Sequence, residues 1–180
     1  MIHTFRPTDA FVDESLRGQR YLMGCVLLEA RSLASVRAEI SSLRLGGGRI
    51  HFNNESTRQR RRVLAAIAAM PISATVVVCN RGQGTTAFTA RSLCLEQIVQ
   101  HLQAHEVARL VLESRGYDGE DIRTLGRVRA PHPPLIFEHR IGATEPLLWI
   151  ADGISWAVGA GGTWRSFVMS IVEEIVQLRP

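Results

Sequence analysis

The first part of the chain alternates short apolar runs with polar residues that interrupt them. One apolar run, 10–12, ends at Asp13, and a longer one covers 21–28. Residues 16–19, which include Gly18, can turn the chain between the two runs. This pattern predicts a β-hairpin with acidic residues at its mouth.

Apolar positions at helical spacing predict helices farther along, and β-branched runs predict strands. Helices are expected over 32–45, 56–70, 86–106 and 121–128, and two more should finish the chain after Thr144, as N-cap, and Pro146. Strands are expected over 72–79, 109–112 and 135–137, the last of these being the final strand. Glycines 46–48 should end the first helix, and Ser56 with Gln59 forms a capping-box pattern. Phe88 is expected on the inner side of the third helix.

A hairpin followed by strands that alternate with helices predicts an α/β fold with a mixed β-sheet flanked by helices. The length of 180 residues lies in the usual range of one domain, and a hydrophobic fraction of 46% can fill a substantial core. We therefore expect a single domain over 1–180. Sheets of this kind usually bind ligands beyond the carboxyl ends of their strands.

Several features predict a cytoplasmic protein without a membrane partner. Residues 1–9 lack the continuous apolar stretch of a signal peptide. The most apolar segment, 146–162, is interrupted by Asp152 and is shorter than the roughly 20 residues that cross a bilayer. No C-x-x-C pair is present, so we expect all cysteines to be small buried hydrophobic residues. These are Cys25, Cys79 and Cys94.

The charge pattern favours a nucleic-acid partner, either RNA or DNA. The net charge is +4, and all 21 basic residues are arginine. An arginine fork donates two parallel hydrogen bonds to a phosphate, although a GC-rich genome would give the same composition. The candidate nucleic-acid contacts are Arg49, Arg58, Arg61 and Arg62. The last three belong to a charge run over 58–62 on one helix, for which the alternative is a solvated helix face.

Acidic residues follow two of the expected strands. Asp13 and Glu14 come directly after one apolar strand, and Glu113 follows another. In a mixed sheet these carboxylates could converge, and they would repel one another unless a cation joined them. The alternative is the ordinary chemistry of turns and strand ends.

Asp152 is the only charged residue in a helix that is apolar on nearly every side. Such a helix is normally buried, and a buried carboxylate is costly unless it is paired, hydrogen-bonded or bound to a metal. Asp152 therefore needs a partner. The alternative to a functional role is a buried ion pair with one of the arginines.

Two histidines lie in positions where they could bind a metal or transfer protons. His51 follows the glycine-rich connection and precedes a polar run at 53–55. A loop histidine that merely forms hydrogen bonds is the alternative. Glu138 and His139 form a second acid and histidine pair, for which an exposed strand end is the alternative.

The order of several short motifs resembles one known family. The motifs are F-V-D-E-S at 11–15, Y-L-M-G-C-V-L at 21–27, I-H-F at 50–52, L-E at 112–113 and L-W-I-A-D-G at 148–153. Together they resemble the bacterial domain-of-unknown-function family 3800, over about residues 11–160. Leu16 departs from the family's opening motif, which has glycine there, and Arg49 stands where an acid often precedes the histidine by two residues.

That resemblance implies an RNase H-like fold and a divalent-metal site for phosphodiester cleavage. It gives Asp13, Glu113 and Asp152 as ligands of Mg²⁺ or Mn²⁺, with Glu14 and His51 as further catalytic residues. Two such ions, about 3.5–4 Å apart, would activate water and stabilise the leaving oxygen.

We therefore expect a metal-dependent nuclease that acts on RNA or DNA. The main alternative is a non-catalytic RNase H-like module that binds nucleic acid or protein. A third class is a structural subunit, in which Trp149, Trp156 and Trp164 help to bury a homodimer interface. The sequence lacks the phosphate-loop, dinucleotide-binding and serine-hydrolase motifs, which removes support for those activities.

Overall fold

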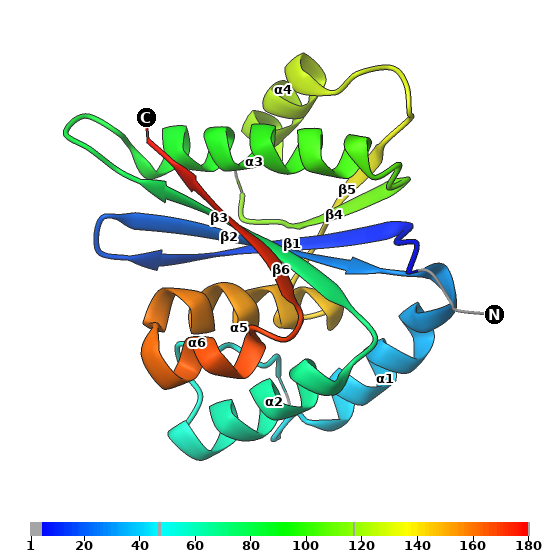
Figure 1. Ribbon diagram of the computed structural model, residues 1–180, viewed down its shortest axis with the longest axis vertical. Coiled ribbons are helices and arrows are strands. Elements are labelled where there is room, and N and C mark those ends of the chain that lie inside the picture. The colour runs from blue at the N-terminus through cyan, green and yellow to red at the C-terminus, as the bar shows by residue number, and fades with distance from the viewer. Residues whose placement is uncertain (1–4, 47, 117, 180) are drawn as a thin grey trace.

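The computed structural model describes residues 5–46, 48–116 and 118–179. The described strands form one mixed six-stranded sheet in the order β5-β4-β1-β2-β3-β6 (Figure 1). The strands are β1 Asp9–Arg17, β2 Arg20–Leu28, β3 Ser73–Asn80, β4 Arg109–Glu113, β5 Ile136–Arg140 and β6 Val172–Leu178. The strands β1, β2 and β3 are antiparallel neighbours, whereas β4 lies parallel to β1, β5 to β4, and β6 to β3.

Helices cover both faces of this sheet. They are α1 Leu33–Ser42, α2 Thr57–Ala69, α3 Ala87–Ala104, α4 Asp118–Val128, α5 Leu147–Ala160 and α6 Gly162–Val168, with a short 3₁₀ helix at Ala30–Ser32. Figure 1 shows α3 and α4 on one face and α1, α2, α5 and α6 on the other. The α/β fold with a mixed sheet between helices is thus confirmed.

The predicted hairpin is confirmed, but its acids do not lie at the mouth. Strand β1 continues to Arg17, so Asp13 and Glu14 are in mid-strand, where Asp13 pairs with Gly24. The apolar run ends earlier than the strand because backbone hydrogen bonds to β2, not apolar side chains, extend the pairing. Parallel pairing of β1 with β4 stops at Val12, one residue before Asp13.

The end of the chain differs from the prediction, because β6 follows α6 where a helix was expected. Its sequence is rich in β-branched residues, and it is an edge strand that pairs only with β3. Thr144 is not an N-cap: its hydroxyl donates to the carbonyl oxygen of Ile141, and α5 starts after Pro146.

Other details of the helices were predicted in part. Phe88 is 46% exposed, because it lies in the first turn of α3. The capping box is only half formed. Ser56 Oγ accepts a hydrogen bond from the backbone N–H of Gln59, whereas the Gln59 side chain donates to the carbonyl oxygen of Leu43. Of the glycines expected to end the first helix, Gly47 lies outside the described residues.

The core consists of one apolar layer on each side of the sheet, and α5 lies wholly within one of them. Every α5 residue from Leu147 to Gly159 is buried. Trp149 and Trp156 are therefore core residues of this chain, which leaves the expected homodimer interface without support from them. The predicted burial of the free cysteines is confirmed. Among the described residues, no helix is long and apolar enough to cross a membrane.

Two glycines let α5 pack closely against its neighbours. A Cβ added at Gly24 of β2 would lie 2.7 Å from the carbonyl oxygen of Ala151, and one added at Gly153 would lie 2.6 Å from the Phe52 ring. Neither contact is sterically acceptable. The close approach brings Asp152 onto the sheet, near β1.

Gly153→Ala is expected to destabilise the protein by about 1–3 kcal/mol, because the methyl group overpacks the contact with Phe52. Gly126→Ala in α4 is the matched control. A Cβ there meets nothing within 4 Å, so this variant should gain about 0.5–1 kcal/mol. Urea unfolding measures both, and equal effects of the two variants would contradict the packing described.

Candidate functional site

Three acidic side chains from separate parts of the chain meet on one face of the sheet. Side chains alternate along a strand, so Asp13 shares the face of Phe11, and Glu113 shares that of Val111. This is the face on which α5 packs and delivers Asp152. The three carboxylate residues are only 3–4% exposed. The sequence predicted that Asp13, Glu14 and Glu113 could converge. Asp13 and Glu113 lie on this face together with Asp152, which the family resemblance added, whereas Glu14 does not.

Asp13 and Glu113 interact directly with one another. Burial raises the pKa of Asp13 well above its ordinary value; Arg115 opposes that shift, and neighbouring carboxylates add to it. Those carboxylates belong to Glu113, Asp152 and Glu14. Burial would raise the pKa of Glu113 as well, but a hydrogen bond from Asp13 and the charges of Arg115 and Arg49 lower it. The pKa of Asp13 is thus raised and that of Glu113 is lowered, so Asp13 is the acid of this pair that holds a proton more readily.

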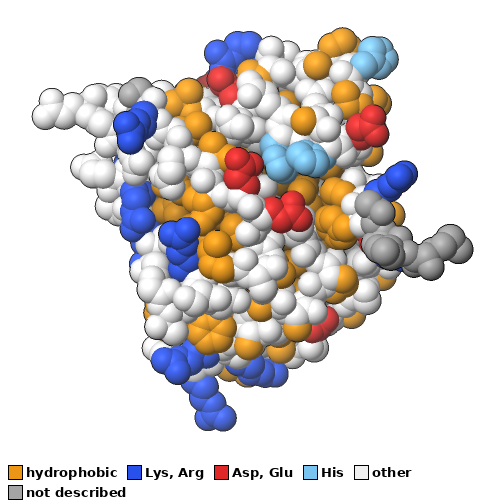
Figure 2. All heavy atoms as spheres, viewed as in Figure 1, with side chains coloured by type: hydrophobic (Ala, Val, Ile, Leu, Met, Phe, Trp, Pro, Cys, Tyr) orange, Lys and Arg blue, Asp and Glu red, His pale blue; other side chains and the backbone are white. Residues whose placement is uncertain are grey.

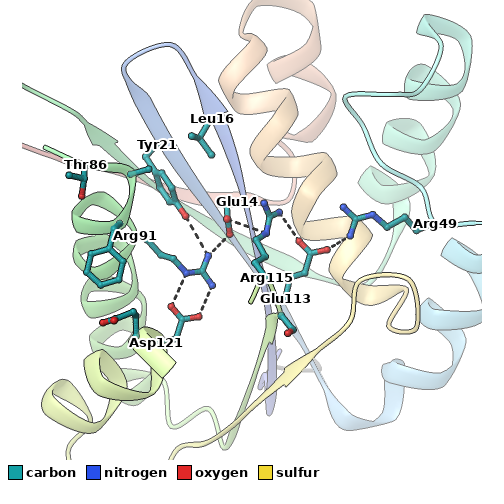
Figure 3. Close-up of a pocket in the computed structure, with 13 residues that line it drawn as sticks. Glu14, Leu16, Tyr21, Arg49, Thr86, Arg91, Glu113, Arg115 and Asp121 are labelled. Atoms are coloured by element: carbon teal, nitrogen blue, oxygen red, sulfur yellow. Dashed lines mark hydrogen bonds and ion pairs between the residues drawn. The ribbon is translucent and has the colours of Figure 1, made fainter. Parts of the chain in front are cut away.

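Two arginines supply positive charge to these acids (Figure 3). Arg115 Nη2 lies 2.6 Å from both Asp13 Oδ1 and Glu113 Oε2, and its Nε lies 3.2 Å from Glu14 Oε1. Arg49, which the sequence suggested as a nucleic-acid contact, forms an ion pair with Glu113. The position at which the family resemblance has an acid thus carries a cation that neutralises the site.

Asp152 has a partner, as its burial required, but the partner is not an arginine. Its Oδ2 accepts from the backbone amide of Phe52 at 3.0 Å and lies 3.1 Å from Nδ1 of His51. The loop before α2 therefore brings His51 to the acids, as predicted. An amide and an imidazole compensate this buried carboxylate.

Glu14 lies on the opposite face from Asp13, because the two are consecutive in one strand. It forms an ion pair with Arg91 of α3, which also binds Asp121 with two hydrogen bonds of 2.8 and 2.7 Å. His139 Nε2 lies 3.0 Å from the same Asp121 carboxylate. Glu14 thus belongs to a second buried charge network that touches the first through Arg115 (Figure 3).

Glu138 and His139 do not form one ligand set. They point to opposite sides of β5, and Glu138 pairs with Arg109 and Arg140 near the surface. His139 instead joins Asp121. The alternation of side chains along the strand separates the two.

A cavity of about 1040 Å³ lies beside the acids, on the side of α3 and α4 (Figure 3). Glu14 and Glu113 are part of its wall, together with Arg49, Arg91 and Arg115. The apolar side chains of Leu16 and Phe88, both nearly half exposed, also line it. Its wall also includes Glu120 and Asp121, so the cavity carries acids as well as arginines, and its apolar side chains can pack against flat rings.

Sequence reasoning missed Arg115, Arg91 and Asp121. A signal for Arg91 was present: it precedes Cys94 and Leu95 at helical spacing, so a charge interrupts an apolar stripe. Arg115 had no such signal, since it follows Glu113 in a polar loop. The predicted contacts Arg58, Arg61 and Arg62 are exposed on α2 and, within the described chain, form no ion pair with an acid.

Comparisons with known proteins bear on the fold. A scan against protein-family models finds no match, and no curated protein matches. Among solved structures, the ribonuclease H2 from Pyrococcus horikoshii OT3 superposes with a TM-score of 0.52 at 13% sequence identity. The match covers 84% of this chain and 72% of that chain. At this identity the likeness concerns the fold alone, and it confirms the RNase H-like mixed sheet flanked by helices.

Asp13→Asn is expected to stabilise the protein at pH 8 in EDTA, by roughly 1–2 kcal/mol. Because the pKa of Asp13 is raised in the folded protein, protonated Asp13 contributes its full stability only below the ordinary carboxyl range. That contribution is lost as the pH rises through the raised pKa. The stability that Asp13→Asn gains over the wild type should therefore be smaller at pH 5 than at pH 8. Urea unfolding at both pH values measures it.

Asp118→Asn is the control, and its change in stability is expected to have the opposite sign. Burial would raise the pKa of Asp118, but hydrogen bonds from Ser114 and the Arg115 backbone, together with the charges of nearby His139 and Arg91, lower it. Asp118→Asn should therefore lose stability at pH 8 and lose less as the pH falls through the range where Asp118 is protonated. A loss of stability in Asp13→Asn at pH 8 would contradict the charge balance described.

Proposed function

We propose that this protein is a divalent-metal-dependent nuclease that hydrolyses phosphodiester bonds of RNA or DNA. The observation that carries the proposal is the meeting of Asp13, Glu113 and Asp152, all buried, on one face of an RNase H-like sheet. Structural proteins gain nothing from gathering buried acids of like charge. The ribonuclease activity named for the structural neighbour supports the same reaction class.

The donor set fits Mg²⁺ or Mn²⁺, which prefer carboxylate oxygens. Glu113 Oε2 is buried and forms no hydrogen bond of its own, although it lies 2.6 Å from Arg115. Burial raises the pKa of Asp13, Arg115 opposes that shift, and Glu113, Asp152 and Glu14 add to it, so a cation bound here would favour the charged carboxylate. Among the described side chains, however, no group of three or more acids, histidines or cysteines is already arranged around one point. Arg115 supplies the positive charge in this arrangement.

Asp13, Glu113 and Asp152 would hold the cation, which when bound supplies Lewis-acid charge and a water of lowered pKa. His51 holds Asp152 through Nδ1, so its other ring nitrogen can carry a proton. Arg49 and Arg115 reach both the acids and the cavity, where they can bind phosphate oxygens.

A non-catalytic binding module is the second candidate, and a specific observation favours it. Arg49 and Arg115 already form ion pairs with Glu113, so Glu113 does not need a metal ion to balance its charge. Such ion pairs are expected in a site that has lost its catalytic metal. The cavity between these arginines and Phe88 would bind a strand equally well without cleaving it. Metal-dependent cleavage separates the two candidates.

Wild-type protein is expected to cleave at least one of labelled single-stranded RNA, single-stranded DNA or hybrid duplex with Mg²⁺ or Mn²⁺, and none in EDTA. Asp152→Asn should lose on the order of 100-fold or more, because it removes a charge from the proposed metal ligands. Glu39→Gln, an exposed acid of α1, should retain full activity.

Circular dichroism of each variant shows whether it is folded. Cleavage that persists in folded Asp152→Asn would exclude the proposed site. Absence of cleavage on every substrate, with binding retained, would favour the binding module.

A further inference from the structure

Arg17, the last residue of β1, has a partly buried side chain. Its Nε and Nη2 atoms are both buried and form no hydrogen bond. Buried donors are nearly always paired, so these two atoms leave capacity for a hydrogen-bond acceptor such as a phosphate oxygen or water. The stem of Arg17 rests on Gly159 of α5, where an added Cβ would lie 3.0 Å from Arg17 Cγ. The side chain is therefore held in place while its polar end is unsatisfied.

Two more arginines lie beside Arg17. Arg20 donates from Nη2 to the carbonyl oxygen of Gly159 at 2.9 Å. Arg60 lies over the Trp156 ring, with its Cζ 4.6 Å from the centroid, and Arg17 Cζ lies 4.9 Å from the same centroid. Within the described chain none of these arginines forms an ion pair with an acid. The group therefore carries uncompensated positive charge.

The charges of this group act on one another. Burial lowers the pKa of Arg17, and the charges of Arg60 and Arg20 lower it further, whereas Asp152 acts in the other direction. Like charges held together in this way are relieved by an anion. In Figure 2, Arg side chains gather along the left and lower left of the face shown, the side on which Figure 1 places the β1–β2 turn and α6.

We propose that Arg17, with Arg20 and Arg60 beside it, binds a backbone phosphate of a nucleic-acid strand. Trp156, against which Arg17 packs, follows Asp152 by one turn of α5. The bound phosphate lies roughly one or two nucleotides from a phosphate presented to the acids. This spacing between the two phosphates rests on the proposed nuclease function, whereas the phosphate binding itself does not.

The alternative explanation is that these arginines only cap the carbonyl end of α5 and pack on tryptophan. Arg20 fits that description, since it bonds the carbonyl of Gly159. Arg60 also has a structural role, since it donates to the carbonyl oxygens of Phe52 and Asn53. Arg17 does not, because its buried donors have no such bond. A structural role would make Arg17→Gln destabilising, whereas a binding role leaves stability unchanged or raises it.

Fluorescence anisotropy of labelled single-stranded RNA and DNA in EDTA, over a range of salt concentrations, tests the proposal without cleavage. Arg17→Gln should weaken binding about 5- to 10-fold at low salt and reduce the salt slope by about one. Arg127→Gln is the control for loss of one charge, because Arg127 is an exposed residue of α4 paired with Glu96. It should change binding less than about twofold.

Equal binding by Arg17→Gln and Arg127→Gln, or a clear fall in Tm for Arg17→Gln, would overturn the proposal. A parallel titration with inorganic phosphate separates the source of the anion. Phosphate could raise the Tm of wild type but not of Arg17→Gln, while oligonucleotides bind both proteins equally. In that case the site binds small phosphates, and the nucleic-acid assignment is wrong. Binding in EDTA does not depend on cleavage, so absence of metal-dependent cleavage with Arg17-dependent binding retained would count against the nuclease proposal alone.

Discussion

Buried negative charge at the carboxyl end of β4 constrains the structure around it. Pairing of β1 with β4 and the close packing of α5 bring Asp13, Glu113 and Asp152 out of water together. Such burial is costly unless each charge is compensated. The Arg115 guanidinium beside Asp13 and Glu113, and the amide and imidazole around Asp152, provide that compensation. These contacts tie the loop 49–52 and the end of β4 to α5 and β1.

Ion pairs of one arginine link the charged groups on the two faces of the sheet. Arg115 touches Asp13 and Glu113 on the α5 face and Glu14 on the other, where Arg91 continues the network to Asp121. The cavity opens on the α3 side of this junction, and the uncompensated arginines lie around Trp156 on the α5 side. The acids thus lie between a cavity lined by both arginines and acids and a group of arginines that form no ion pair among the described residues.

The sequence predicted the elements whose patterns are strong. The mixed sheet, the buried helix around Asp152 and its need for a partner all followed from periodicity and from the cost of burying charge. The partner itself could not be predicted, since His51 reaches Asp152 only through tertiary packing. Glu14 was misplaced because the apolar run ends before β1 does, and side-chain alternation then sends it to the other face. The segment 172–178 forms a strand because β3 offers it an edge.

Direct titration with Mn²⁺, followed by the electron paramagnetic resonance signal of the free ion, tests the central claim that these acids form one cation site. The account predicts stoichiometric binding to wild-type protein and at least about tenfold weaker binding to Asp13→Asn and Asp152→Asn. It also predicts unchanged binding to Glu39→Gln. No binding to wild type, or equal binding by all four proteins, would show that Arg115 is the permanent partner of these acids and would contradict the account.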